Sequence, residues 1–153
     1  MKKILCITGI LACYFALTLP AFAEDGVTNS KIKLGQSCAI TGPASALGTG
    51  MSTGLLAYFN KINKAGGING RQIELLTLDD GYEPDKAIAN TKKLIDEQKV
   101  FMLIGEVGTP TSKAVVPIVE KAKVPFFGPF TGAEFLRNPF KRYVVNARGS
   151  YYQ

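Results

Sequence analysis

The chain has 153 residues, of which 46% are hydrophobic and 20% are charged, a balance typical of a globular protein and not of a disordered one. It contains no histidine, which excludes Ser-His-Asp sets, Cys-His sets and histidine metal sites within these residues. The formal net charge is +6, but the lysines are scattered and form no dense stripe, so we do not expect a nucleic-acid-binding protein.

Residues 1–23 have the pattern of a cleavable secretory signal peptide. A positive start at Lys2 and Lys3 precedes a nearly all-apolar run, and small residues stand at positions −3 and −1 of a cleavage site before Glu24. The alternatives are a membrane anchor, for which the run is shorter than the roughly 20 residues required, and lipoprotein processing at Cys13. We predict an exported protein.

The cysteine content agrees with a protein that has no internal disulfide. Once residues 1–23 are removed, Cys38 is the one cysteine that remains. It directly follows an apolar stretch, so we expect Cys38 to be a small buried hydrophobic residue and not a reactive thiol.

The first predicted elements are a strand and a helix. Alternating apolar residues at 31–40 predict a strand, which Thr41-Gly42-Pro43 ends. A loop of small residues is expected to run to Gly50, and apolar residues at helical spacing predict a helix over 49–64. That helix stops at Gly66-Gly67.

The same alternation continues along the chain. Residues 72–78 predict a strand that Asp79-Asp80-Gly81 ends, and Pro84 begins a helix that runs to about 98. The continuous apolar run at 100–104 predicts a strand covered on both faces.

The last predicted elements are shorter. Thr109 or Thr111 is expected to cap a helix that runs to about Ala122. A strand at 124–127, a helical turn at 133–136 and a strand at 143–146 follow. Strands that alternate with helices predict an α/β fold, with a doubly wound, mostly parallel sheet covered by helices on both faces.

Ligands of such sheets bind outside the carboxyl ends of the strands, so four loops are candidate binding segments. They are rich in small and hydroxyl-bearing residues. Thr109, Thr111 and Ser112 lie where a helix is expected to begin, and helix N-termini favour anions such as carboxylates. Ordinary turn and capping roles explain any one of these residues alone, but their clustering favours a ligand site. The four loops are residues 41–48, 106–112, 129–132 and 148–152.

No catalytic set is apparent. Asp79 and Asp80 are adjacent carboxylates, but neighbours on a strand point to opposite faces, so we expect them to cap the following turn. Gly48-Thr49-Gly50 with Gly54 is wrongly spaced for a dinucleotide-binding loop. We therefore expect no enzyme, no cofactor and no metal.

Several segments carry a resemblance to a known family. Ile32-Lys33-Leu34-Gly35, Thr41-Gly42-Pro43, the "AGGINGRQIEL" stretch from Ala65 and the strand end at Asp79-Asp80 resemble periplasmic substrate-binding proteins of branched-chain amino-acid-type ABC transporters. The resemblance covers residues 31–153. It implies a type I periplasmic-binding fold, in which two α/β lobes close over a ligand. Residues 24–153 would form the N-terminal lobe, and the second lobe is missing.

The resemblance also implies a set of binding residues. Loops after the third, fourth and fifth strands would hold the polar end of the ligand, and the loop near Ala46 and Leu47 would face its side chain. Amino-acid binders tend to carry an acidic residue near Ser150, and its absence favours an aromatic-lined site for a less cationic ligand. The predicted ligand-binding residues are Ala46, Leu47, Thr109, Thr111, Phe130, Thr131, Gly132, Ser150 and Tyr151.

The function that this resemblance implies is solute capture in the periplasm. The protein would be a monomer that binds an amino acid or a related small organic molecule and delivers it to a transporter permease. Three alternatives stay open: a ligand-sensing domain of a membrane receptor, a truncated lobe without function, and an exported enzyme whose catalytic residues lie beyond Gln153.

Overall fold

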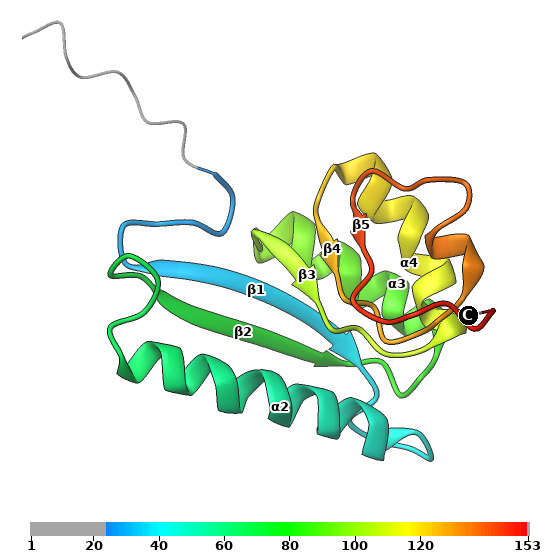
Figure 1. Cartoon of the computed structure of the whole chain (residues 1–153), viewed down its shortest axis with the longest axis horizontal. Coiled ribbons are helices and arrows are strands. Elements are labelled where there is room, and N and C mark those ends of the chain that lie inside the picture. The colour runs from blue at the N-terminus through cyan, green and yellow to red at the C-terminus, as the bar shows by residue number, and fades with distance from the viewer. Residues whose placement is uncertain (1–23, 153) are drawn as a thin grey trace, which may run out of the picture.

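A five-stranded parallel sheet organises the computed structural model, which describes residues 24–152 (Figure 1). The predicted signal peptide lies outside the described residues. Every pair of neighbouring strands is parallel, and the spatial order is β2-β1-β3-β4-β5. The strands are β1 (Lys31–Cys38), β2 (Gln72–Asp79), β3 (Met102–Ile104), β4 (Phe126–Phe127) and β5 (Val144–Val145).

The helices cover both faces of the sheet, as predicted. α2 (Ser45–Lys64) lies along β1 and β2 on one face, while α3 (Pro84–Lys92) and α4 (Thr109–Ala122) pack together on the other (Figure 1). A π-helical turn, η2 (Lys93–Glu97), continues α3, and a short 3-10 helix, η3 (Glu134–Leu136), follows β4. The doubly wound α/β prediction is confirmed.

Two hydrophobic clusters form the core, one on each face of the sheet. Side chains alternate along a strand, so neighbouring residues such as Leu103 and Ile104 enter different clusters. The cluster beneath α2 contains buried Leu34, Phe59 and Ile104 with partly buried residues around them. The cluster beneath α3 and α4 contains Ala87, Leu94, Val100, Leu103, Val115, Val116, Val119, Phe126, Leu136 and Val144.

The prediction that a loop of small residues runs to Gly50 is wrong, because α2 already begins at Ser45. One of these small residues, Gly48, instead allows α2 to pack closely against the backbone after β1. A Cβ atom placed on Gly48 would lie 1.9 Å from the carbonyl oxygen of Ala39, so only glycine lets α2 approach the chain after β1. Composition alone does not distinguish this contact from a flexible loop.

The predicted threonine cap of α4 is also wrong. The N-cap position is Gly108, and no side chain accepts a hydrogen bond from the free N–H groups of the first turn. Gly108 has φ 116°, and a Cβ atom there would lie 2.5 Å from the ring of Tyr82. Glycine is therefore required by both backbone conformation and packing.

Four of the five predicted strands are longer than the observed ones, whereas β2 extends one residue beyond its predicted end. β1 ends at Cys38, two residues before the predicted end, β3 and β4 each begin two residues after the predicted start, and β5 loses one residue at each end. Strand pairing sets these limits, because β3, β4 and β5 each pair with a neighbour over two residues. Within residues 24–152, no helix combines the length and the apolar character needed to cross a membrane.

We predict that Gly48→Ala destabilises the protein and that Gly50→Ala does not. The new methyl group at position 48 clashes with backbone, and overpacking of this kind costs about 1–3 kcal/mol. Gly50 is exposed in the same helix with no atom within 4 Å of an added Cβ, so alanine there is expected to stabilise by about 0.5–1 kcal/mol. Urea unfolding of both variants measures the difference, and equal effects would contradict the packing role of Gly48.

Candidate ligand-binding site

The loops after β3, β4 and β5 are joined by backbone hydrogen bonds at the carboxyl edge of the sheet. The Phe130 N–H donates to the Glu106 carbonyl at 2.7 Å, and the Tyr151 N–H donates to the Gly132 carbonyl at 2.9 Å. A parallel bridge also links Val107 with Phe130. The candidate residues are thus held by the sheet itself and do not depend on side-chain contacts alone.

Three hydroxyl groups form a row across these loops. The Thr109 and Thr131 hydroxyl oxygens lie 2.7 Å apart, and the Thr131 oxygen lies 3.2 Å from the Tyr151 hydroxyl. The central residue of this hydroxyl row, Thr131, is buried, while Thr109 is half-buried and Tyr151 is exposed, so the row reaches the surface at its Tyr151 end. It can donate to and accept from a polar group on a ligand.

The hydroxyl row changes the acidity of its outer member. Hydrogen bonds from Thr131, then from Thr109 and from the Gly132 backbone, lower the pKa of the exposed Tyr151 phenol to about 8. The positive charge of Arg148 contributes to the same effect. The row is therefore suited to stabilising negative charge.

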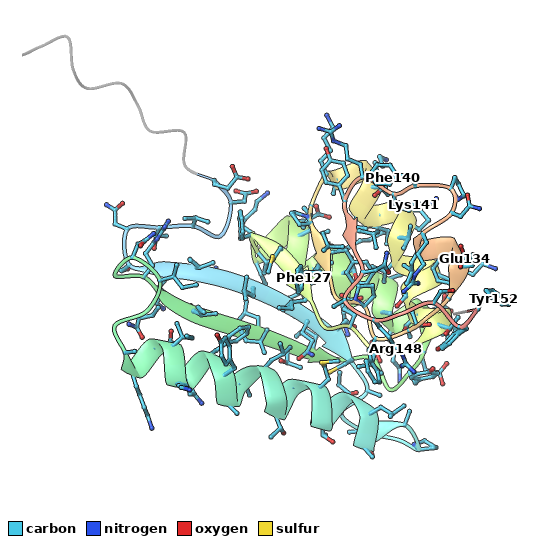
Figure 2. The ribbon with its side chains drawn as sticks, viewed as in Figure 1. Phe127, Glu134, Phe140, Lys141, Arg148 and Tyr152 are labelled. Carbon is cyan, nitrogen blue, oxygen red and sulfur yellow. The ribbon has the colours of Figure 1, made fainter. Side chains whose placement is uncertain are left out.

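Arg148 lies in the loop after β5, at the end of the sheet toward which the strand arrows point (Figure 2). Its guanidinium carbon is 4.7 Å from the centre of the Phe130 ring and 5.6 Å from that of the Tyr151 ring. Cation–π attraction orients the side chain between the two rings. Sequence reasoning placed Arg148 in a candidate loop but did not select it, although it is the one charged residue of that loop.

An apolar pocket opens beside these residues, with a volume of about 560 Å³. Pockets of roughly 300–1,000 Å³ hold small organic ligands. The sequence prediction missed the residues from α2 and from the sheet face, since they are ordinary core positions in a helical or strand pattern. The side chains that line the pocket are mainly those of Met51, Leu55, Ile104, Phe127, Phe130 and Arg148.

Five of the nine predicted binding residues come together in this region. Thr109, Thr131 and Tyr151 form the hydroxyl row, and Phe130 lies under Arg148. Gly132 is needed for the position of Tyr151, because a Cβ atom there would lie 2.6 Å from the tyrosine ring.

Four predicted residues lie apart from the row. The Thr111 hydroxyl is buried and donates to the Val107 carbonyl at 2.7 Å. The Ser150 hydroxyl donates to the Glu134 carboxylate at 3.0 Å. The two remaining residues, Ala46 and Leu47, are exposed in the first turn of α2 and do not line the pocket.

Asp79 fixes the loop that leads from β1 into α2. Its exposed carboxylate accepts hydrogen bonds from the Ile40 N–H at 2.8 Å, the Thr41 hydroxyl at 2.6 Å and the Gly81 N–H at 2.9 Å. These bonds, the one from Thr41 above all, hold the pKa of Asp79 well below its usual range. The predicted turn-capping role is confirmed, and the link to the β1 loop is an addition that sequence neighbours alone do not reveal.

Asp80 points to the opposite side and is buried. It accepts a hydrogen bond from the Ser37 hydroxyl at 2.8 Å and another from the Tyr82 N–H, also at 2.8 Å. Burial raises the pKa of Asp80. Burial first, and the negative charge of Asp80 second, also raise the pKa of the Cys38 thiol to about 12, which agrees with its predicted inert character.

Glu106 is a buried residue of the loop between β3 and α4, three positions before Thr109. Neither carboxyl oxygen has a hydrogen-bond partner in the described part of the chain, and the side chain is 1% exposed. Burial first, and the charge of Asp80 second, raise the pKa of Glu106 well above its ordinary value. Burial therefore favours the neutral, protonated form of this carboxyl group.

The observed sheet order, the pocket at its carboxyl edge and the sequence itself agree with one family. Residues 31–153 match the sequence profile of the periplasmic binding proteins. The chain belongs to this family. Its fold is that of the type I periplasmic binding proteins, and the members of the family are substrate-binding proteins.

Individual relatives are longer than this chain. A leucine-, isoleucine-, valine-, threonine- and alanine-binding protein of Pseudomonas aeruginosa is 30% identical over 107 residues, which are 70% of this chain and 28% of that protein. The structure of a possible leucine/isoleucine/valine-binding protein from Rhodopirellula baltica is 40% identical with a TM-score of 0.76, covering 86% of this chain and 34% of the other.

A third relative is named for a different ligand. A fatty acid ABC transporter substrate-binding protein from Thermomonospora curvata is 28% identical with a TM-score of 0.75, over 84% of this chain and 32% of that one. The chain thus spans about a third of the length of the proteins that it resembles.

We predict that Glu106→Gln makes the protein more stable at pH 8 and changes little near pH 4. The pKa of Glu106 is higher in the folded state than in the unfolded state, so the folded state binds the proton more tightly. Wild-type stability therefore falls as pH rises above the unfolded pKa, and glutamine removes this loss. Urea unfolding at pH 4, 6 and 8 gives the difference between the two proteins, and a pH-independent difference would contradict the prediction.

Proposed function

We propose that this chain is the N-terminal ligand-binding lobe of an exported solute-binding protein of an ABC importer. Residues 1–23 would direct export to the periplasm and be removed, and residues 24–153 would form the lobe. Its ligand would be an amino acid or a related small organic molecule, which the protein passes to a membrane permease.

The observation that carries this proposal is the hydroxyl row next to the apolar pocket, at the carboxyl edge of the sheet. A ligand with one polar end and one apolar end meets both parts of this surface at once. The relatives support the same chemistry, since leucine and a fatty acid share a carboxylate and an aliphatic chain.

The proposal has a direct test in ligand binding. The exported protein is purified and titrated in a calorimeter with leucine, isoleucine, valine and fatty acids of different length. We expect at least one of these compounds to bind and to raise the melting temperature, because a ligand that binds the folded state stabilises it. Absence of binding by all of them would contradict the proposal.

We predict that Thr109→Ala weakens ligand binding and leaves the fold intact. The substitution removes one member of the hydroxyl row, and one neutral hydrogen bond contributes about 0.5–1.5 kcal/mol, or roughly a two- to tenfold change in affinity.

Thr53→Ala is the matched control, because Thr53 is exposed on α2 and does not line the pocket. Equal affinity of the Thr109→Ala variant and wild type, with unchanged melting curves, would remove Thr109 from the site.

A further inference from the structure

The Arg148 guanidinium has no charged partner. In the part of the chain that the structure describes, the only ion pair joins Lys31 to Glu74 at the opposite end of β1, and no described hydrogen bond uses the Arg148 guanidinium. Its backbone carbonyl accepts a hydrogen bond from Arg137, which fixes the loop but leaves the side-chain donors unused. Five N–H donors and a positive charge therefore face the site without a protein acceptor.

The two aromatic rings give this charge a defined position. Phe130 lies beneath the guanidinium at 4.7 Å, and the same phenylalanine forms part of the wall of the apolar pocket. Tyr151, the second ring, ends the hydroxyl row. Arg148 thus stands between the apolar pocket on one side and the hydroxyl row on the other.

The wall of the pocket carries positive charge only, among the described residues. Among the described residues that line it, Arg148 is the one charged residue, and no carboxylate belongs to the lining or to the hydroxyl row. Glu134, the acidic residue that lies close to the C-terminal loop, already accepts a hydrogen bond from Ser150. A ligand ammonium would meet a cation here and find no counter-charge, whereas a carboxylate would find one.

We propose that Arg148 binds the carboxylate of the ligand, and that the ligand is an apolar monocarboxylate without an ammonium group, whose hydrocarbon body lies in the pocket beside Phe127 and Phe130. This inference rests on the proposed function and narrows it to a ligand class. A planar guanidinium binds a carboxylate through two parallel hydrogen bonds, and the hydroxyl row supplies further donors to the same anion. An aromatic or branched hydrocarbon body matches the apolar walls and the volume of the pocket.

Matched pairs of probes test this proposal. The exported protein is titrated with 3-phenylpropanoate and phenylalanine, and with 4-methylpentanoate and leucine, which differ within each pair only by the amino group. We expect each deaminated acid to bind more tightly than its amino acid. Tighter binding of the amino acids would overturn the proposal while leaving solute binding as the function.

Substitution of the arginine gives the second test. We expect Arg148→Gln to weaken binding of 3-phenylpropanoate roughly ten- to a hundredfold, because a charge-assisted contact is lost, and Arg148→Lys to restore part of the affinity. Arg142→Gln is the control for net charge, since Arg142 is exposed at the other end of β5 and outside the pocket.

The outcomes separate the inference from the function on which it rests. If 3-phenylpropanoate or leucine binds and Arg148→Gln changes its affinity less than twofold, the role of Arg148 is wrong and the binding function stands. If Arg142→Gln weakens binding as much as Arg148→Gln, net charge and not a contact explains the effect, and the proposal also falls. If none of the four probes and none of the fatty acids binds, the proposed function itself fails.

Discussion

The reversal of strand order between β1 and β3 is the constraint on which the rest of the structure depends. The chain turns from β1 to β2 on one side and reaches β3 on the other. Right-handed crossovers then place α2 on one face of the sheet and α3 and α4 on the opposite face. The candidate site lies at the carboxyl edge of this sheet, where α2, the helix that follows β1, meets the ends of β3, β4 and β5.

Two aspartates hold the two sides of this edge in different ways. Asp79 is exposed and ties the start of the β1 loop to the end of β2, whereas Asp80 is buried and bonds to Ser37 within the sheet. Glu106 is a second buried carboxyl group, in the loop between β3 and α4, and unlike Asp80 it has no hydrogen-bond partner among the described residues. An unpartnered buried polar group costs stability, and this one lies next to the residues that would contact a ligand. The carboxyl edge of the sheet therefore holds both the polar groups of the candidate site and a buried polar group that lowers the free energy of unfolding.

The fold was predictable from sequence because it depends on periodicity. Alternation in β1 and helical spacing in α4 are local patterns, and each survives in the structure with small changes at its ends. The start of α2 was not predictable, because it depends on the contact between Gly48 and the Ala39 backbone. That contact forms only in the folded structure and leaves no local pattern in the sequence.

In the candidate site too, features that depend on local sequence were predictable, and features that depend on contacts between distant residues were not. The threonines and Tyr151 were accessible to prediction because their residue types cluster in loops at strand ends. Arg148 was not selected because its importance comes from stacking on Phe130, a residue 18 positions earlier that the β4–β5 pairing brings beside it. The roles of Thr111 and Ser150 also could not be inferred, since only the three-dimensional structure shows that their hydroxyl groups are already engaged.

Exposure of the site residues places a physical limit on what this surface achieves alone. Phe130 is 38% exposed and Tyr151 is 57% exposed, so a ligand resting on them keeps one side in water. Small-molecule sites usually bury about 70–90% of their ligand, and an open surface also leaves the charge of Arg148 screened by solvent. Closure by a second surface would remove that water and strengthen the contact between a carboxylate and Arg148. Tight binding at this edge therefore requires a partner surface that faces the hydroxyl row and the pocket together.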